Sequence, residues 1–145
     1  MWSLVVVLFS VSAFAELGGT ADSVKADQQR VQGALRVSQT QAYAMHEIRT
    51  PNNGLIHEFV SPAGKVFAVT YQGPFPGEAN GLLGSYAPQI EQARKAASGQ
   101  RHVSGTVHVE APGLVYHAAG HMRYFSMKAY VPDAIPQGMG REKIQ

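Results

Sequence analysis

The sequence predicts an α+β fold: an antiparallel β-meander of about five to six strands with one long amphipathic helix packed on a face. Three observations predict it. Short stretches of alternating apolar and polar residues recur, a strong hairpin turn joins two of them, and the apolar period changes from two to about 3.6 between residues 79 and 97. A short N-terminal helix completes the expected order of helix, three strands, helix and three strands.

The clearest predicted element is a β-hairpin within residues 54–75. Its loop, Ser61–Lys65, carries proline at the second position and glycine at the fourth, which favours a three-residue loop with a bulge. Counting back from this loop predicts that Phe59 faces Phe67 and that Leu55 faces Tyr71. The same count places Val60, Glu58 and Ile56 together on the other side of the sheet. Both sides are partly apolar, so we expect a central hairpin.

Two helices and a further strand surround this hairpin. Residues 20–32 predict a short surface helix that packs weakly, with Thr20 as N-cap and Gly33 as the stop. A strand is expected over residues 43–50. The apolar stripe of residues 79–97 contains Pro88, and either one kinked helix or two helices with Pro88 in a first turn would explain it.

The first fifteen residues, MWSLVVVLFSVSAFA, have the pattern of a signal peptide that is cleaved near Ala15. The apolar run is shorter than the roughly 20 residues of a membrane-spanning helix. An uncleaved anchor is the alternative, because no Lys or Arg precedes the run. We therefore expect an exported protein, periplasmic or secreted, without a transmembrane span in the mature form. Residues 16–131 form the single predicted domain and residues 132–145 a loose tail.

The composition excludes several functions. There is no cysteine, so the chain has no thiol nucleophile, disulfide or thiolate metal site. The formal net charge is only +2, and acidic and basic residues are interspersed. A nucleic-acid-binding surface needs clustered basic residues, and the sequence shows no such cluster.

The sequence of the C-terminal part predicts three strands, which would bring three histidines together. A two-residue turn at Pro112–Gly113 would place His108 opposite His117. A second loop over residues 117–121, like the loop of the first hairpin, would place His117 opposite His121. This register gathers seven apolar residues on one face: Val107, Val109, Leu114, Tyr116, Ala118, Met122 and Tyr124. Beyond residue 123 the apolar side switches, which a bulge or a second covering layer would explain.

Three imidazoles side by side could hold a divalent metal ion. The candidate ligands are His117, His121 and His108, with Glu110 and Arg123 beside them. The pair of His117 and His121 is the better supported part of this hypothesis. The alternative is a solvated sheet face on which histidine is merely tolerated. We expect no other cofactor.

Two long sequence segments resemble a known family. EFVSPAGKVFAVTYQGPFPG, followed by LLGSY, and the later GHMRYFSMKAYVPDAIPQG occur in that order. Together they resemble a bacterial family of small exported proteins that is known only as a domain of unknown function. The resemblance covers most of the mature chain. It implies export, and it supplies no catalytic residues.

Three functions fit these observations. The first is a non-catalytic exported module that binds an envelope component or a small ligand; a concave sheet face with Tyr71, Tyr116 and Tyr124 could take an apolar molecule. The second is the metal-binding protein described above. The third is a hydrolase built on a serine and a histidine, which no spacing in the sequence supports. At the level of architecture the fold is analogous to cystatin-like folds, and this analogy carries no function.

Overall fold

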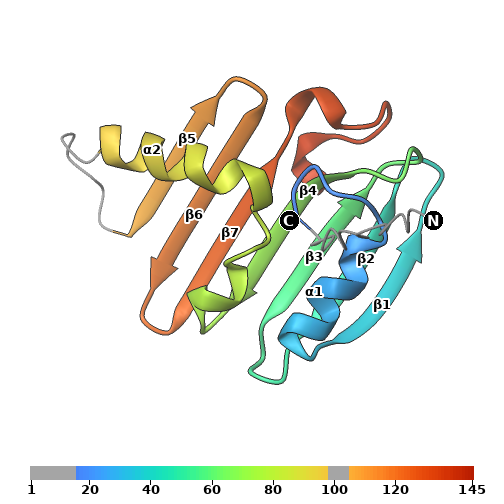
Figure 1. Cartoon of the computed structure of the whole chain (residues 1–145), viewed down its shortest axis with the longest axis horizontal. Coiled ribbons are helices and arrows are strands. Elements are labelled where there is room, and N and C mark those ends of the chain that lie inside the picture. Colours follow the sequence, from blue (N-terminus) through green and yellow to red (C-terminus); the bar gives the residue numbers. More distant parts are fainter. Residues whose placement is uncertain (1–15, 98–104) are drawn as a thin grey trace, which may run out of the picture.

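The computed structural model describes residues 16–97 and 105–145, which form one antiparallel sheet with two α-helices on the same face (Figure 1). The predicted signal segment lies outside the described residues. The strands are β1 (Ala34–Gln39), β2 (Ala44–Arg49), β3 (Leu55–Val60), β4 (Val66–Gly73), β5 (Thr106–Ala111), β6 (Leu114–His121) and β7 (Tyr124–Tyr130). The helices are α1 (Ser23–Val31) and α2 (Ala87–Ala97), with 3-10 turns η1 (Pro76–Ala79), η2 (Gly84–Tyr86), η3 (Pro132–Ala134) and η4 (Arg141–Lys143). None of the described helices is long and apolar enough to cross a membrane.

The strand order β1-β2-β3-β4-β7-β6-β5 departs from a simple meander. Strands β1 to β4 pair with one another in chain order. After β4 the chain crosses the helix-bearing face to the far edge of the sheet, where β5 lies. Strand β6 follows beside β5, and β7 then pairs with both β6 and β4. The predicted antiparallel sheet with covering helices is confirmed. The predicted five to six strands become seven among the described residues, because β1 is a mostly exposed edge strand without a clear apolar alternation.

The predicted long helix is shorter than expected. Two 3-10 turns precede α2, which has 11 residues and carries Pro88 in its first turn. This is the second of the two arrangements that the apolar stripe allowed. Gly81 and Gly84 have positive φ angles of 94° and 49°, which a continuous α-helix does not accommodate.

The first hairpin has the predicted loop but a different register. Ser61 N donates to Lys65 O at 2.8 Å, and Val60 pairs with Val66 as expected. The register then shifts by one residue between Phe59 and Val60, so that Phe59 pairs with Ala68 instead of Phe67. The prediction of the remaining pairs was therefore wrong: Ile56, not Leu55, faces Tyr71. A bulge inserts an extra residue without a change in turn chemistry, so the loop sequence alone does not reveal it.

In the second half of the sheet, the predicted loop over residues 117–121 differs from the structure. Ala111 pairs with Leu114 and His108 with His117, as the turn at Pro112–Gly113 predicts. Strand β6, however, continues to His121, and a two-residue turn with Arg123 at φ 63° leads into β7. His121 pairs with Tyr124, so the prediction that His117 faces His121 was wrong.

This shorter turn also removes the predicted switch of the apolar side. Met127 pairs with Ala118, and Ala129 with Tyr116, on the face that the helices cover. Met122, at the tip of the turn, is 90% exposed, and Tyr124 is 54% exposed, so neither belongs to the apolar set where the sequence placed them.

Two hydrophobic cores lie on opposite faces of the sheet. The larger core joins both helices to the sheet and includes Val24, Leu82 and Ile90. The smaller core lies on the other face, where Phe59 and Phe67 pack against Met139 and Ile144 of the C-terminal segment. The prediction of a loose tail was wrong, because Ile144 is fully buried and Met139 is 7% exposed. We call the face with the helices the helix face and the other the tail face.

Replacing Ile144 with alanine tests the docking of the tail. We expect Ile144→Ala to lower the free energy of unfolding by about 2–5 kcal/mol, the usual range for a buried Ile or Leu truncated to alanine. Urea denaturation would measure it, with Val37→Ala as the control because Val37 is 52% exposed on the edge strand β1. Equal stability of the two variants would show that the tail does not contribute to the core.

Candidate functional site

A cavity lies on the helix face between α2 and strands β5, β6 and β7. Its volume is about 980 Å³, at the upper end of the range for small-molecule sites. Apolar side chains form most of its wall: Leu83, Ile90, Val107, Tyr116, Phe125 and Met127. We call this cavity the α2 groove. It exists because the 11-residue α2 is the only described helix over this half of the sheet (Figure 1).

A few polar groups accompany this apolar wall. Tyr116 is 6% exposed, and burial raises the pKa of its phenol, while the charge of Arg94 opposes the rise. Among the described residues, no hydrogen-bond partner is found for the Tyr116 hydroxyl. Arg94 and Lys95 on α2 share one acid, Glu91, at 3.7 and 3.8 Å. The groove therefore combines an apolar wall with a phenol and a nearby guanidinium.

Loop η1 forms one wall of the α2 groove and is held by a carboxylate. Glu78 accepts hydrogen bonds from Thr50 at 2.9 Å, Asn52 at 3.0 Å and Tyr71 at 3.2 Å. Burial is the main cause that raises the pKa of Tyr71 to about 12, and its hydroxyl also donates to Phe75 O at 2.8 Å. Tyr71 is thus a structural residue. Tyr116 is the one member of the predicted tyrosine set that lines this cavity.

The three predicted metal ligands do not form one cluster. His108 and His117 lie side by side, with ring centroids 5.9 Å apart, and His108 contacts Glu110 at 3.2 Å. His121 lies four residues farther along β6 than His117, which corresponds to about 13 Å of strand. Among the described residues, no group of three or more histidine, aspartate or glutamate side chains is arranged to hold a metal ion.

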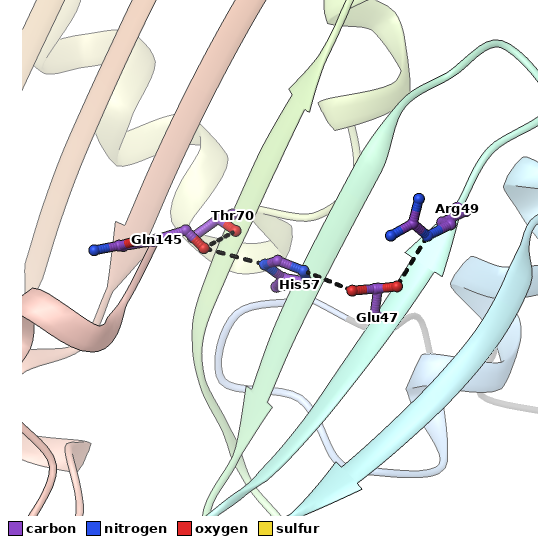
Figure 2. A network of polar contacts seen from close by, with 5 residues as sticks. All are labelled: Glu47, Arg49, His57, Thr70 and Gln145. Carbon is purple, nitrogen blue, oxygen red and sulfur yellow. Dashed lines mark hydrogen bonds and ion pairs between the residues drawn. The ribbon is translucent and has the colours of Figure 1, made fainter.

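The sequence contains two His-Glu dipeptides, at residues 46–47 and 57–58, and the structure pairs them crosswise. Strands β2 and β3 place His46 opposite Glu58 and Glu47 opposite His57. On the tail face, Glu47 contacts His57 at 3.3 Å and Arg49 at 3.0 Å, and these contacts lower the pKa of Glu47, the Arg49 hydrogen bond most. Figure 2 shows this chain of contacts, which begins at Arg49.

The same chain of contacts ends at the C-terminal segment. His57 Nδ1 lies 3.1 Å from the main-chain oxygen of Gln145, and Thr70 donates to the same oxygen at 3.0 Å (Figure 2). His57 therefore lies between two hydrogen-bond acceptors, the Glu47 carboxylate and the main-chain oxygen of Gln145. The arrangement places an acceptor where a catalytic histidine would need a nucleophile. We interpret this network as a set of contacts that holds the C-terminal segment against the sheet.

On the helix face the other pair consists of Glu58, which is buried near Asp27 of α1, and His46, which is half-buried. Glu58 is fully buried, and Asp27 of α1 is 1% exposed and contacts Arg30 at 2.8 Å. Neither Glu58 oxygen nor the outer oxygen of Asp27 has a donor among the described residues, and the buried Nδ1 of His46 also has no partner. Burial raises the pKa of Glu58 to about 9, and the charge of Asp27 adds to the rise. A protonated Glu58 can donate to Asp27, whereas two carboxylates would repel.

Part of this buried arrangement can be predicted from the sequence. Strand alternation already places Glu58 on the face of Ile56 and Val60. Asp27 follows Val24 by three residues on the same side of the short helix, and both are buried. The α2 groove left no sequence signal, because its volume depends on the distance between elements rather than on a motif.

A family model described as "Protein of unknown function (DUF2844)" matches residues 13–144. The chain belongs to this family. The family resemblance of the two sequence segments is thereby confirmed. No curated protein and no solved structure gives a significant match, so the cystatin-like comparison remains an analogy of architecture.

The pair of Glu58 and Asp27 in this DUF2844 chain predicts a pH-dependent stability. The folded state holds the Glu58 proton up to pH about 9, while the unfolded chain releases it near 4.5. The stabilisation is therefore complete below pH about 4.5 and declines as the pH rises to about 9, with a slope of about 1.4 kcal/mol per pH unit for one proton. Glu58→Gln has no proton to lose, so we expect it to flatten this slope.

Thermal or urea unfolding between pH 5 and pH 9 would measure the slopes. Glu110→Gln is the matched control, because its side chain is 72% exposed. If wild type and Glu58→Gln lose stability in parallel as the pH rises, the proton is not held by this pair.

Proposed function

We propose that the protein is a non-catalytic, exported binding module that takes an elongated amphipathic molecule with one anionic group in the α2 groove. The α2 groove carries this proposal: about 980 Å³, mostly apolar, with Tyr116 and Arg94 beside it. Ligand sites commonly combine such a wall with a few polar groups that orient the ligand. The anionic group would meet the Arg94 guanidinium and the Tyr116 hydroxyl, and the apolar body would lie on Val107 and Ile90.

A binding function is favoured over hydrolysis by what the groove and its surroundings contain. No serine hydroxyl is hydrogen-bonded to a histidine among the described residues. The histidine with an acidic partner in Figure 2 binds the tail instead of a nucleophile. A metal function would rest on His108 and His117 without His121, because the register separates His121 from them.

Long-chain carboxylates test the proposed function. We expect the protein lacking residues 1–15 to bind a dansyl-labelled fatty acid at one site, and unlabelled dodecanoate to compete. Val107→Phe should weaken binding about tenfold or more, because its ring would occupy the groove where Val107 lines it. Val37→Phe is the matched control, since Val37 is an exposed valine on the opposite edge strand.

The anionic end is tested separately. Arg94→Gln should weaken dodecanoate binding about three- to tenfold and leave dodecanol binding unchanged, because only the carboxylate meets the guanidinium. Arg36→Gln, on β1, is the charge control. Failure of every long-chain probe to bind, or equal binding by Val107→Phe, would contradict the proposal.

Export is part of the proposed function and has its own test. The family match begins at residue 13, so most of the expected leader lies outside it. Leu17 is fully buried and its N–H donates to Leu82 O at 2.9 Å, which favours cleavage before residue 17. Expressed with its leader in a bacterial host, the protein should be found outside the cytoplasm with a mass that begins at Glu16. A cytoplasmic protein that keeps residues 1–15 would contradict export.

A further inference from the structure

Three exposed apolar side chains lie at one end of the sheet, where β4 ends and β6 turns into β7. Met122 is 90% exposed, Tyr124 54% and Phe75 52%. The other large apolar side chain that is exposed among the described residues, Val37, lies on the far edge strand β1. Single exposed apolar residues are common, whereas a group of them in one place marks a contact surface. We call the three residues, together with Arg123, the apolar tip.

Strand pairing places the parts of the apolar tip next to one another. Gly73, the last residue of β4, pairs with Phe125 of β7, so Phe75 follows this pair by two residues and Tyr124 precedes it by one. The Tyr124 hydroxyl donates to Gln72 Oε1 at 3.1 Å, which joins the start of β7 to the end of β4. Figure 1 shows the turn between β6 and β7 at the same end of the sheet as η1, which begins directly after Phe75.

The turn at the apolar tip contains residues that its backbone does not favour. His121 pairs with Tyr124, so Met122 and Arg123 are the two residues of the loop. Arg123 has a φ of 63°, a conformation that favours glycine or asparagine. Residues held in such conformations are concentrated at functional sites. An exposed methionine beside an arginine in this turn therefore favours a role in binding.

The charge at the apolar tip is positive. Residues 72–76 and 119–126 include Arg123 and contain no aspartate or glutamate. Glu78, the next acid along the chain, already accepts three hydrogen bonds from other side chains. The end of the chain docks at Thr70, which lies three residues, or roughly 10 Å, before the end of β4. The Arg123 guanidinium is thus the charged group nearest to the apolar side chains in the turn.

We propose that the apolar tip binds the surface of a lipid bilayer that contains anionic phospholipids. The rings and the methionine would enter the layer between headgroups and acyl chains, and the Arg123 guanidinium would meet the phosphates. The shape of the tip favours a bilayer over a protein partner. A stable protein interface buries about 800 Å² on each side, whereas a two-residue turn can insert between headgroups without a flat surface around it.

The position of the tip also connects it to the α2 groove. Pro76, Gly120 and Phe125 line the groove, and each lies within two residues of the apolar tip in the chain. A bilayer bound by the tip would therefore lie at one end of the groove. This part of the inference rests on the proposed function: the bilayer would be the source of the amphipathic ligand.

A tryptophan reporter tests the insertion of the tip. Trp2 is the only tryptophan of the chain, so the protein that begins at residue 16 contains none. With vesicles of phosphatidylglycerol and phosphatidylethanolamine, we expect the emission of Met122→Trp to shift to shorter wavelength and to be quenched by brominated lipids. Val37→Trp is the matched control, because Val37 is an exposed apolar residue away from the tip, and its emission should not change.

Co-sedimentation with the same vesicles measures the strength of binding. Arg123→Gly should weaken binding about fivefold, which is the usual effect of one basic residue at an anionic surface. Its midpoint of thermal unfolding should equal or exceed that of the wild type, because glycine suits a φ of 63°. Met122→Ser should also weaken binding about fivefold or more. Arg36→Gln, on β1, should bind as the wild type does, and added salt or neutral phosphatidylcholine vesicles should weaken binding.

Three outcomes would overturn this inference. These are an emission of Met122→Trp that anionic vesicles leave unchanged, an equal shift in Val37→Trp, and equal vesicle binding by Arg123→Gly and the wild type. Self-association that Met122→Ser abolishes, without any vesicle binding, would instead assign the tip to contact with a second copy of the chain. Val107→Phe should keep its vesicle binding while it loses the fatty acid, so failure of this inference is distinguishable from failure of the proposed function.

Discussion

The pairing of β4 with β7 is the interaction on which the rest of the structure depends. It joins the first four strands to the last three and places β4 at the centre of the sheet. All but one of the eight residues of β4 are buried, and they contribute to both cores: Val69 and Tyr71 on the helix face, Phe67 and Ala68 on the tail face. A strand buried on both sides needs cover on both sides. The helices provide it on one face and the C-terminal segment on the other.

The two faces are covered to different extents, and the α2 groove follows from this difference. Because β7 returns to the centre, the chain must cross from β4 to the far edge over the helix face, and α2 belongs to this crossover. One helix of 11 residues leaves the groove between itself and β5–β7. On the tail face, the docked segment packs over Phe59 and Phe67, and the main-chain oxygen of Gln145 accepts a hydrogen bond from Thr70.

The sheet also explains why acids and histidines recur on β2 and β3. Antiparallel pairing of two His-Glu steps places one His-Glu pair on each face. On the tail face, Glu47 and His57 contact each other, and His57 holds the tail. On the helix face, Glu58 lies under α1 beside Asp27, where burial favours a shared proton over two charges. The same His-Glu dipeptide therefore leads to two chemical roles, and the burial of each pair determines which role it has.

The sequence by itself determined the local elements: the turn chemistry of Ser61–Lys65 and Pro112–Gly113, the position of β2, and membership of a family of unknown function. These depend on residues that are neighbours in the chain. Only the tertiary structure decided the bulge at Phe67, the separation of His117 from His121, the docking of Ile144 and the return of β7 to β4. Each of these depends on which distant surfaces bury one another, and neither turn propensity nor apolar periodicity carries that information.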